Sequence, residues 1–252
     1  MGAVSRSLTW DGCFNVRDLG GLETASGGRT RRGAVVRADN VRRLSAAGWQ
    51  AALDHGVRRV VDLRFESEQR DEPEPPDGVD VVAVSLFGAH DPVAEGRVAE
   101  RLMGMDDVAA AHAGFYIRTL EKRPETVAAA VAAVAAPDHA EGVVIHCFAG
   151  KDRTGIVSAL VLAVAGVPDE LIATDYAESA PNMRHLFDGW IAKADDESER
   201  ELRRRLAAAE HATMLEVMEW LRGSAGGAAG YLREAGFADA QITRLRARLV
   251  EA

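Results

Sequence analysis

The sequence predicts an α/β fold in which a central, mostly parallel sheet is flanked by helices and followed by a helical C-terminal part. Short valine-rich runs at 34–38, 57–64, 79–85 and 142–146 alternate with helical patterns, as expected when helices link the strands of one sheet. The C-terminal third shows helical spacing of apolar residues and no convincing strand. Since no segment repeats along the 252 residues, we expect a single domain spanning residues 1–252.

Local signals place the elements between these strands. Ser45 is expected to cap a helix that runs to about His55, because Gly56 supplies the usual stop signal. Residues 106–121 and the alanine-rich residues 124–136 are predicted to form two more helices. Residues 66–78 hold six acidic residues and three prolines, so we expect a solvated loop there.

Charge and composition exclude several classes of function. The net charge of −9 argues against nucleic-acid binding, which depends on clustered lysine and arginine. The charge is uneven, since residues 1–45 hold eight arginines against four acids, and such a basic end suits a phosphorylated ligand or is simply a solvated surface. The longest apolar stretch without a charge, Thr154–Pro168, has 15 residues, whereas a membrane-spanning helix needs about 20. We therefore expect no stable membrane insertion.

The start of the chain and its cysteines bear on location. The opening MGAVSRSLTWDG contains no apolar segment typical of a signal peptide, so we expect a cytoplasmic protein, with leaderless export as the alternative. Cys13 and Cys147 are too few for a disulfide scaffold and form no zinc-ribbon pair, which fits a reducing compartment. The sequence does not indicate the oligomeric state.

One segment carries the strongest chemical signal. It reads Cys147-Phe148-Ala149-Gly150-Lys151-Asp152-Arg153-Thr154-Gly155, between a predicted strand and a predicted helix. A short loop of this kind turns successive backbone N–H groups toward one centre at a helix N-terminus, which binds anions. Gly150 allows the turn, and Arg153 can hold two phosphate oxygens in a bidentate pair. We predict a phosphate site formed by residues 148–154.

Cys147 lies where it could attack a bound phosphate, and its reactive form is the thiolate. The helix dipole, the loop amides and Arg153 are expected to stabilise that thiolate together, with the Thr154 hydroxyl as a further donor to the sulfur. His146 precedes it on the strand, so its side chain points to the other face and is expected to order the loop through hydrogen bonds. A buried structural thiol is the alternative for Cys147. Cys13 is expected to be structural, with a protective disulfide to Cys147 as the alternative.

The segment HCFAGKDRTG, together with NVRDLGG at 15–21, VVRAD at 35–39 and VVDLR at 60–64, resembles the protein tyrosine phosphatase superfamily. Within it, the match is to the bacterial tyrosine phosphatase family typified by a secreted mycobacterial enzyme, and it extends to DYAES at 175–179. The resemblance implies that Cys147 forms a cysteinyl-phosphate and that Arg153 stabilises the transferring phosphoryl group. It implies phosphotyrosine in proteins as substrate, with phosphoserine, phosphothreonine and phosphoinositides as further substrates, and no metal or other cofactor.

The general acid is less well defined, because the Trp-Pro-Asp tripeptide of many relatives is missing. Asp152 is the first candidate, since anionic groups of the substrate would raise its pKa, and its alternative role is to pair with Lys151 or Arg17. Asp62, at the end of a strand, is the second candidate, with an ion pair to an arginine as its alternative role. Lys151 is expected to hold a second phosphate, as in lipid-directed relatives, or to act as a simple phosphate clamp.

Other residues are expected to support the loop or cover it. Arg17, Asp18 and Arg37 lie in the matching motifs and are expected to hold the loop by hydrogen bonds rather than to touch substrate. Residues 182–221 carry apolar stripes separated by a charged stretch, and we expect ordinary core helices there, with a mobile helical lid at 182–210 as the alternative. The alternatives to a protein phosphatase are a catalytically weak phosphate-binding module, a phosphoinositide-specific lipid phosphatase and a rhodanese-like sulfur transferase.

Overall fold

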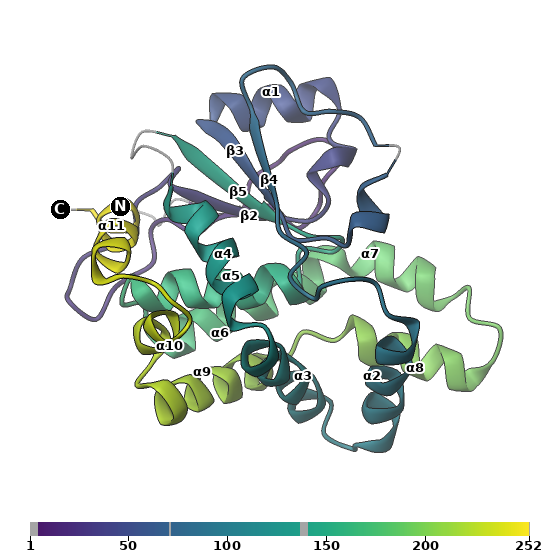
Figure 1. The fold of residues 1–252 in the computed structure, drawn as a ribbon. Helices are drawn as coiled ribbons and strands as arrows, with labels where there is room; N and C mark the ends of the chain where they lie inside the picture. The colour runs from purple at the N-terminus through teal and green to yellow at the C-terminus, as the bar shows by residue number, and fades with distance from the viewer. Residues whose placement is uncertain (1–4, 71, 137–140, 252) are drawn as a thin grey trace.

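The computed structural model describes residues 5–70, 72–136 and 141–251. Its sheet has the strand order β1-β2-β5-β3-β4 (Figure 1). The strands are β1 (Arg17–Asp18), β2 (Val35–Ala38), β3 (Val57–Asp62), β4 (Asp80–Ala83) and β5 (Gly142–His146). Strands β2, β5, β3 and β4 are parallel, and the short β1 runs antiparallel to β2. The predicted α/β fold with a mostly parallel sheet is confirmed.

Helices cover both faces of the sheet (Figure 1). One face carries α1 (Ala46–Asp54), and the other carries α4 (Pro124–Ala135) and α5 (Asp152–Val164). Around them lie α2 (Pro92–Gly104), α3 (Val108–Lys122), α6 (Asp169–Ala177), α7 (Ser179–Ile191), α8 (Glu197–Ala207), α9 (His211–Ala225), α10 (Ala228–Glu234) and α11 (Asp239–Leu249). The C-terminal part is helical, as expected. Within the described ranges, none of these helices has the length and apolarity that crossing a membrane requires.

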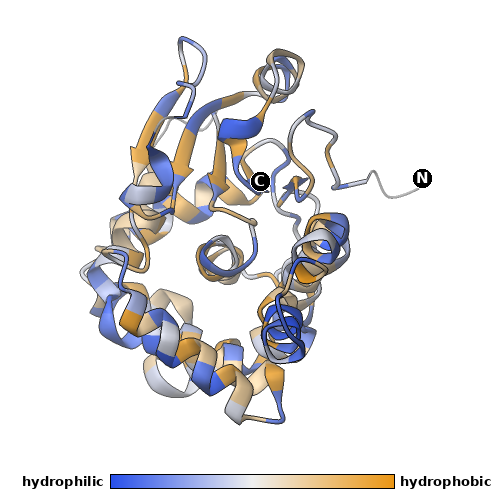
Figure 2. Ribbon diagram, turned by 90° about the vertical axis from the view of Figure 1, so that its right-hand side faces the viewer, coloured by the Kyte–Doolittle hydropathy of each residue, from blue (hydrophilic) through white to orange (hydrophobic). Residues whose placement is uncertain are grey.

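The central strands are buried on both faces, which explains their valine-rich sequences. Successive residues point to opposite sides: Val60 and Val144 pack on the α1 side with Trp10, whereas Val61 and Ile145 pack against the larger helical layer. Figure 2 shows hydrophobic residues concentrated along the strands. Burying one such side chain completely contributes about 1.5–3 kcal/mol, so the sheet is a rigid base for the loops at its edge.

Several predicted elements are present and two were missed. Ser45 caps α1 by accepting a hydrogen bond from the Gly48 amide at 3.1 Å, and the two predicted helices correspond to α3 and α4. The sequence reasoning did not identify α2, although Asp91 caps it and proline occupies its first position, which is a usual helix start. It also missed β1, which has only two residues.

The solvated loop predicted at 66–78 is present in part: its described residues are exposed or half-buried and form no α-helix or strand, but two of its acids pair with buried arginines. Residues Glu66–Gln69 form the 3₁₀ helix η2. Glu68 forms an ion pair with the buried Arg153, and Glu72 forms one with the buried Arg64 at 2.7 Å. Acidic residues favour solvent only when they have no cation to pair with, and here two of them face arginines from the sheet edge and α5. Asp71, another acid of this segment, lies outside the described residues.

Candidate active site

The carboxyl ends of three parallel strands meet at one edge of the sheet. In the β2–β5 and β3–β5 pairings, Ala38 and Asp62 both lie beside His146, the last residue of the central strand β5. Cys147 follows directly, and α5 begins at Asp152. The strand, loop and helix predicted around Cys147 are therefore present, at the edge where α/β folds usually bind ligands.

The carbonyl groups of the loop are tied to the surrounding scaffold. Three consecutive ones accept hydrogen bonds from outside the loop: Phe148 O from Asn40 N at 3.2 Å, Ala149 O from Asn15 Nδ2 at 2.9 Å, and Gly150 O from Arg37 Nη2 at 2.7 Å. In a trans peptide the carbonyl and the next N–H point in opposite directions. The amides that follow these carbonyls therefore point away from the scaffold, and together with the start of α5 they can bind an anion.

Gly150 is required by this geometry, and replacing it is expected to disrupt the loop. Its φ is +65°, and a Cβ there would lie 2.5 Å from the Ala38 carbonyl oxygen. The left-handed conformation costs other residues about 1–2 kcal/mol, and the close contact adds to that cost. We expect Gly150→Ala to lower the free energy of unfolding by about 2–4 kcal/mol in urea titrations.

The matched control for this prediction is Gly226→Ala. Gly226 has nearly the same φ, +67°, but an added Cβ would meet no atom within 4 Å. The control should therefore lose only the conformational part, about 1–2 kcal/mol. Equal losses in the two variants would show that the contact with Ala38 is unimportant.

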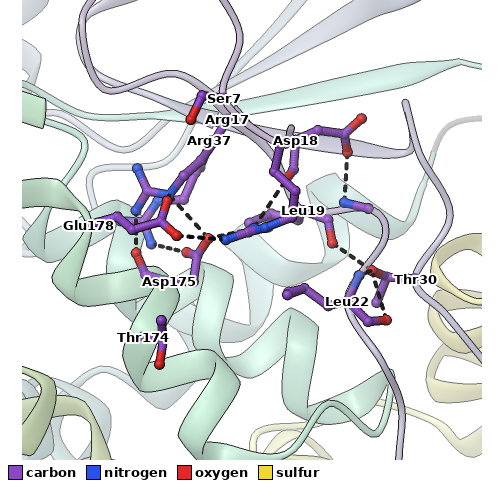
Figure 3. Close-up of polar contacts among 12 residues, drawn as sticks. Ser7, Arg17, Asp18, Leu19, Leu22, Thr30, Arg37, Thr174, Asp175 and Glu178 are labelled. Atoms are coloured by element: carbon purple, nitrogen blue, oxygen red, sulfur yellow. Dashed lines mark hydrogen bonds and ion pairs between the residues drawn. The ribbon is translucent and has the colours of Figure 1, made fainter. Parts of the chain in front are cut away.

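Asp175 of α6 anchors the arginines that hold the loop (Figure 3). Its carboxylate is buried and accepts hydrogen bonds from Arg17 Nε at 3.1 Å, Arg37 Nη1 at 2.7 Å and Arg6 Nη1 at 2.8 Å. Burial alone would raise the pKa of Asp175, but the three arginines outweigh it and hold that pKa far below its ordinary value. Burial, and then repulsion from Arg37, lowers the pKa of Arg17 to about 10.

Arg17 and Arg37 thus contact the protein scaffold. Arg37 reaches the loop itself through Gly150 O, and Arg17 Nη1 donates to Asn15 Oδ1 at 2.6 Å.

Asp18, expected to act with them, instead accepts hydrogen bonds from the amides of Gly20 and Gly33 and contacts His55 (26% exposed) at 3.0 Å. These contacts do not reach the loop.

Arg153 is held by a carboxylate and two aromatic rings. It donates to both oxygens of Glu68, at 2.5 and 3.0 Å, and its guanidinium lies 5.1 Å from the Phe65 ring centre and 5.6 Å from that of Phe87. Burial lowers the pKa of Arg153, but the charges of Cys147 and Glu68 outweigh it, so the pKa is raised. The guanidinium is therefore a fixed, permanently charged group beside the loop.

Asp152 and Arg153 line a cavity of about 640 Å³ that also borders α2 and α3. Asp152 Oδ1 accepts a hydrogen bond from the hydroxyl of Tyr116 at 2.5 Å and lies 3.2 Å from Lys151 Nζ. Burial alone would raise the pKa of Asp152, but Lys151, His112 and Tyr116 outweigh it and lower the pKa. The carboxyl group therefore faces the cavity beside Arg153, and its proton affinity depends on the charges around it.

Lys151 does not extend freely toward the loop interior. Its ammonium group donates to the carbonyl oxygens of Leu206 and Ala208 at 2.6 and 2.7 Å, and the side chain is only 2% exposed. Its third contact is Asp152. Lys151 thus joins the loop after β5 to the C-terminal end of α8.

That link bears on the predicted lid. Residues 182–210 include most of α7 and all of α8, and α8 packs against α2. Arg205 of α8 donates to the carbonyls of Leu102 and Met105. A lid stays a prediction: vanadate is expected to slow hydrogen exchange in 182–210, and unchanged exchange there, with slowed exchange in 147–154, would contradict it.

Asp62 lies in a different environment from Asp152. It accepts hydrogen bonds from Arg64 Nε at 3.0 Å and Nη2 at 2.8 Å, and His146 Nε2 is 3.5 Å away. Burial alone would raise the pKa of Asp62, but His146 and Arg64 outweigh it and hold that pKa far below its ordinary value. Asp62 is not among the described residues that line the Arg153 cavity.

The remaining candidate side chains are buried near the loop. His146 Nδ1 lies 3.2 Å from the Cys147 carbonyl oxygen. Thr154 Oγ1 is buried and, within the described part of the chain, makes no hydrogen bond, so the expected bond to the sulfur is not formed.

The Cys13 thiol donates to Asn40 O at 3.3 Å, and burial, together with the nearby Asp39, raises the pKa of that thiol. Both cysteines are free thiols.

Sequence reasoning missed several residues that shape the site. Each acts through a partner distant in sequence: Asn15, Asn40, Glu68, Tyr116 and Asp175. Asn15 and Asp175 lie inside the motifs NVRDLGG and DYAES, which was a usable signal. Glu68 was hidden among other acids, and Tyr116 on a helix had no signal.

Comparison with known proteins gives a consistent result. Residues 8–251 match the model of the tyrosine phosphatase family. The chain is 29% identical to the triple specificity protein phosphatase PtpB of Mycobacterium tuberculosis, over 95% of this chain and 97% of that protein. It is 30% identical to a tyrosine-protein phosphatase of Nostoc commune, over 87% of this chain and 75% of the relative. The chain therefore belongs to the tyrosine phosphatase family.

Proposed function

We propose that this protein is a cysteine-dependent phosphatase that hydrolyses phosphotyrosine in proteins through a cysteinyl-phosphate. The observation that carries the proposal is the loop after β5, whose carbonyls are tied outward by Asn40, Asn15 and Arg37. This leaves amides, the start of α5 and Arg153 to surround a phosphate next to Cys147. Family membership and the likeness to two named phosphatases support protein phosphatase activity.

In the first step, the Cys147 thiolate attacks phosphorus in line as the bond from phosphorus to the tyrosine oxygen breaks. Asp152 gives its proton to that oxygen, so tyrosine leaves uncharged. In the second step, water attacks phosphorus, the phosphorus–sulfur bond breaks, and Asp152 takes a proton from the water. Arg153 and the loop amides stabilise the charge on the other phosphate oxygens in both steps.

Asp152 is favoured over Asp62 because it faces the Arg153 cavity, whereas Asp62 is engaged by Arg64. Its pKa is lowered in the free protein, but a bound phosphate dianion would oppose ionisation and raise it. The hydrogen bond from Tyr116 fixes the carboxyl group in position. Glu68 positions the Arg153 guanidinium in the free protein. Once phosphate is bound, the guanidinium donates to both Glu68 and the phosphate.

Removing the acid is expected to affect poor leaving groups most. For Asp152→Asn, kcat/KM for phenyl phosphate should fall by about 10²–10³-fold, because phenoxide needs a proton to leave. The fall should be much smaller for 4-nitrophenyl phosphate, whose leaving group is stable as an anion. Steady-state rates with the two esters measure the difference.

Asp62→Asn is the matched control for this prediction. We expect it to lower stability, because Arg64 loses one of its two carboxylate partners, without changing the ratio of rates for the two esters. A dependence on the leaving group in Asp62→Asn, and not in Asp152→Asn, would reverse the assignment.

The proposed function is tested by phosphate release in the presence of EDTA. The substrates are a phosphotyrosyl peptide, a phosphoseryl peptide and a short-chain phosphoinositide. We expect the phosphotyrosyl peptide to be hydrolysed fastest, with slower release from the other two. A faster rate on the phosphoinositide would favour a lipid phosphatase, and vanadate binding without release from any substrate would favour a phosphate-binding module.

A further inference from the structure

A second cavity, of about 580 Å³, lies between α2 and α3 and is strongly basic. We call it the basic groove. Five cationic side chains line it: Arg97, Arg101, Arg118, Lys122 and Arg123. No acidic residue among those the structure describes lines this groove. In a chain with a net charge of −9, such a concentration of positive charge requires an explanation.

Four of these five cations form no ion pair among the described residues. Arg101, Arg118, Lys122 and Arg123 form no side-chain hydrogen bond or ion pair with any described residue, and Arg97 only approaches Asp91 at 4.0 Å. The arginines of α8 behave differently, since Arg200, Arg203, Arg204 and Arg205 all pair with glutamates of their own helix. The groove therefore keeps its charge available for an anion that is not part of the described chain.

Mutual repulsion within the groove supports this interpretation. The pKa of Arg118 is lowered, first by burial and then by the charge of Arg101, although Glu121 acts in the opposite direction. Like charges held close together repel one another, and a bound anion would relieve that repulsion. Arginine suits carboxylates and phosphates, because its planar fork matches their paired oxygens.

The basic groove adjoins the cavity that contains Asp152 and Arg153. The two share one wall, formed by Phe87, Ala94, Val98, Phe115 and Arg123. The rings of Phe87 and Phe115 are in contact, with centres 4.9 Å apart. Figure 1 shows α2 and α3 side by side next to α8. A ligand bound at Arg153 can therefore extend over an apolar ridge into a cationic site.

We propose that the basic groove binds acidic side chains that flank the phosphorylated residue of a phosphoprotein substrate. The proposal rests on the proposed function and names the substrate feature that the enzyme selects. The apolar ridge favours a peptide, whose aliphatic or aromatic side chains can cover Phe87 and Phe115 between the two charged sites. An inositol ring carries an oxygen on every carbon, so it offers less apolar surface to this ridge than an aliphatic or aromatic side chain does. Lys151 cannot supply this second cationic site, because backbone carbonyls and Asp152 already occupy its ammonium group.

The test compares two phosphotyrosyl peptides that differ only in their flanking residues, Asp and Glu in one and Asn and Gln in the other. The variant is Arg101→Gln with Lys122→Gln, both exposed, and the control is Arg244→Gln on the exposed face of α11. In the double variant, KM for the acidic peptide should rise about tenfold, equivalent to about 1.4 kcal/mol. KM for the neutral peptide, and the rate with 4-nitrophenyl phosphate, should stay unchanged.

Equal KM values of the wild-type enzyme for the two peptides would overturn the proposal, as would an equal loss for both in the double variant. A tenfold loss confined to a short-chain phosphoinositide would assign the groove to lipid headgroups instead. Fluorescence titration of the Cys147→Ser variant with the labelled peptides separates this proposal from the proposed function. Selective binding of the acidic peptide, abolished in Arg101→Gln/Lys122→Gln, would support the groove even if the wild-type chain released no phosphate.

Discussion

Replacing Cys147 by serine is expected to lower phosphate release from a phosphotyrosyl peptide by at least about 10⁴-fold. Serine keeps the shape of the side chain, but its hydroxyl stays protonated and no base in the described loop is placed to activate it. The anion site should survive, because Asn15, Asn40 and Arg37 hold the loop through its backbone. Initial rates in EDTA measure the loss, and vanadate titration measures the binding that remains.

The matched control is the same substitution at Cys13. This thiol is also buried and free, and it donates to the carbonyl oxygen of Asn40, the residue whose amide anchors Phe148. Cys13→Ser should keep the rate within about threefold of wild type, since a hydroxyl can replace the thiol as donor. If Cys147→Ser kept a tenth of the wild-type rate, the cysteinyl-phosphate mechanism would be wrong. If Cys13→Ser lost as much of the rate of phosphate release as Cys147→Ser, the loss would come from damage to the fold and not from a missing nucleophile.

The features predicted best are those set by neighbouring residues. Strand β5, the loop and α5 form a continuous stretch in which apolar burial, a glycine turn and a helix start all lie within about twenty residues. The parallel sheet followed from alternation of valine-rich runs with helices. The order of strands did not follow, because pairing β5 between β2 and β3 joins segments about a hundred residues apart.

The site was predicted less completely than the fold, because charge pairing acts across long distances in the chain. An acid-rich segment has the same composition whether its carboxylates are solvated or paired, so nothing singled out Glu68 as the partner of Arg153. A lysine in an anion-binding loop is expected to contact phosphate, because its side chain is cationic. In the structure, however, the Lys151 ammonium group donates to two backbone carbonyls at the end of α8. Both outcomes depend on elements that only the assembled fold brings together.

Asp175→Asn is expected to produce the largest loss of stability in this chain. Asp175 is buried and pairs with Arg37, which holds the loop, with Arg17, which holds Asn15, and with Arg6. Asparagine would leave the buried Arg37 without a carboxylate partner and Arg17 with Glu178 alone, and breaking a buried pair in this way costs about 3–5 kcal/mol. Urea titration at neutral pH measures that loss. Asp188→Asn, on the exposed face of α7, should leave stability unchanged.

The pH dependence of this difference identifies its cause. Because the pKa of Asp175 in the folded protein is below its unfolded value, its contribution is complete above about pH 5 and falls as the carboxylate is protonated in the unfolded chain. The stability gap between wild type and Asp175→Asn should therefore be constant from about pH 5 to 8 and narrow below about pH 4. A gap that stayed constant down to pH 3 would mean that packing, and not charge, is lost. A narrowing gap, with phosphate release lost in parallel, would show that one buried carboxylate maintains both the fold and the loop, since Arg37 joins Asp175 to Gly150.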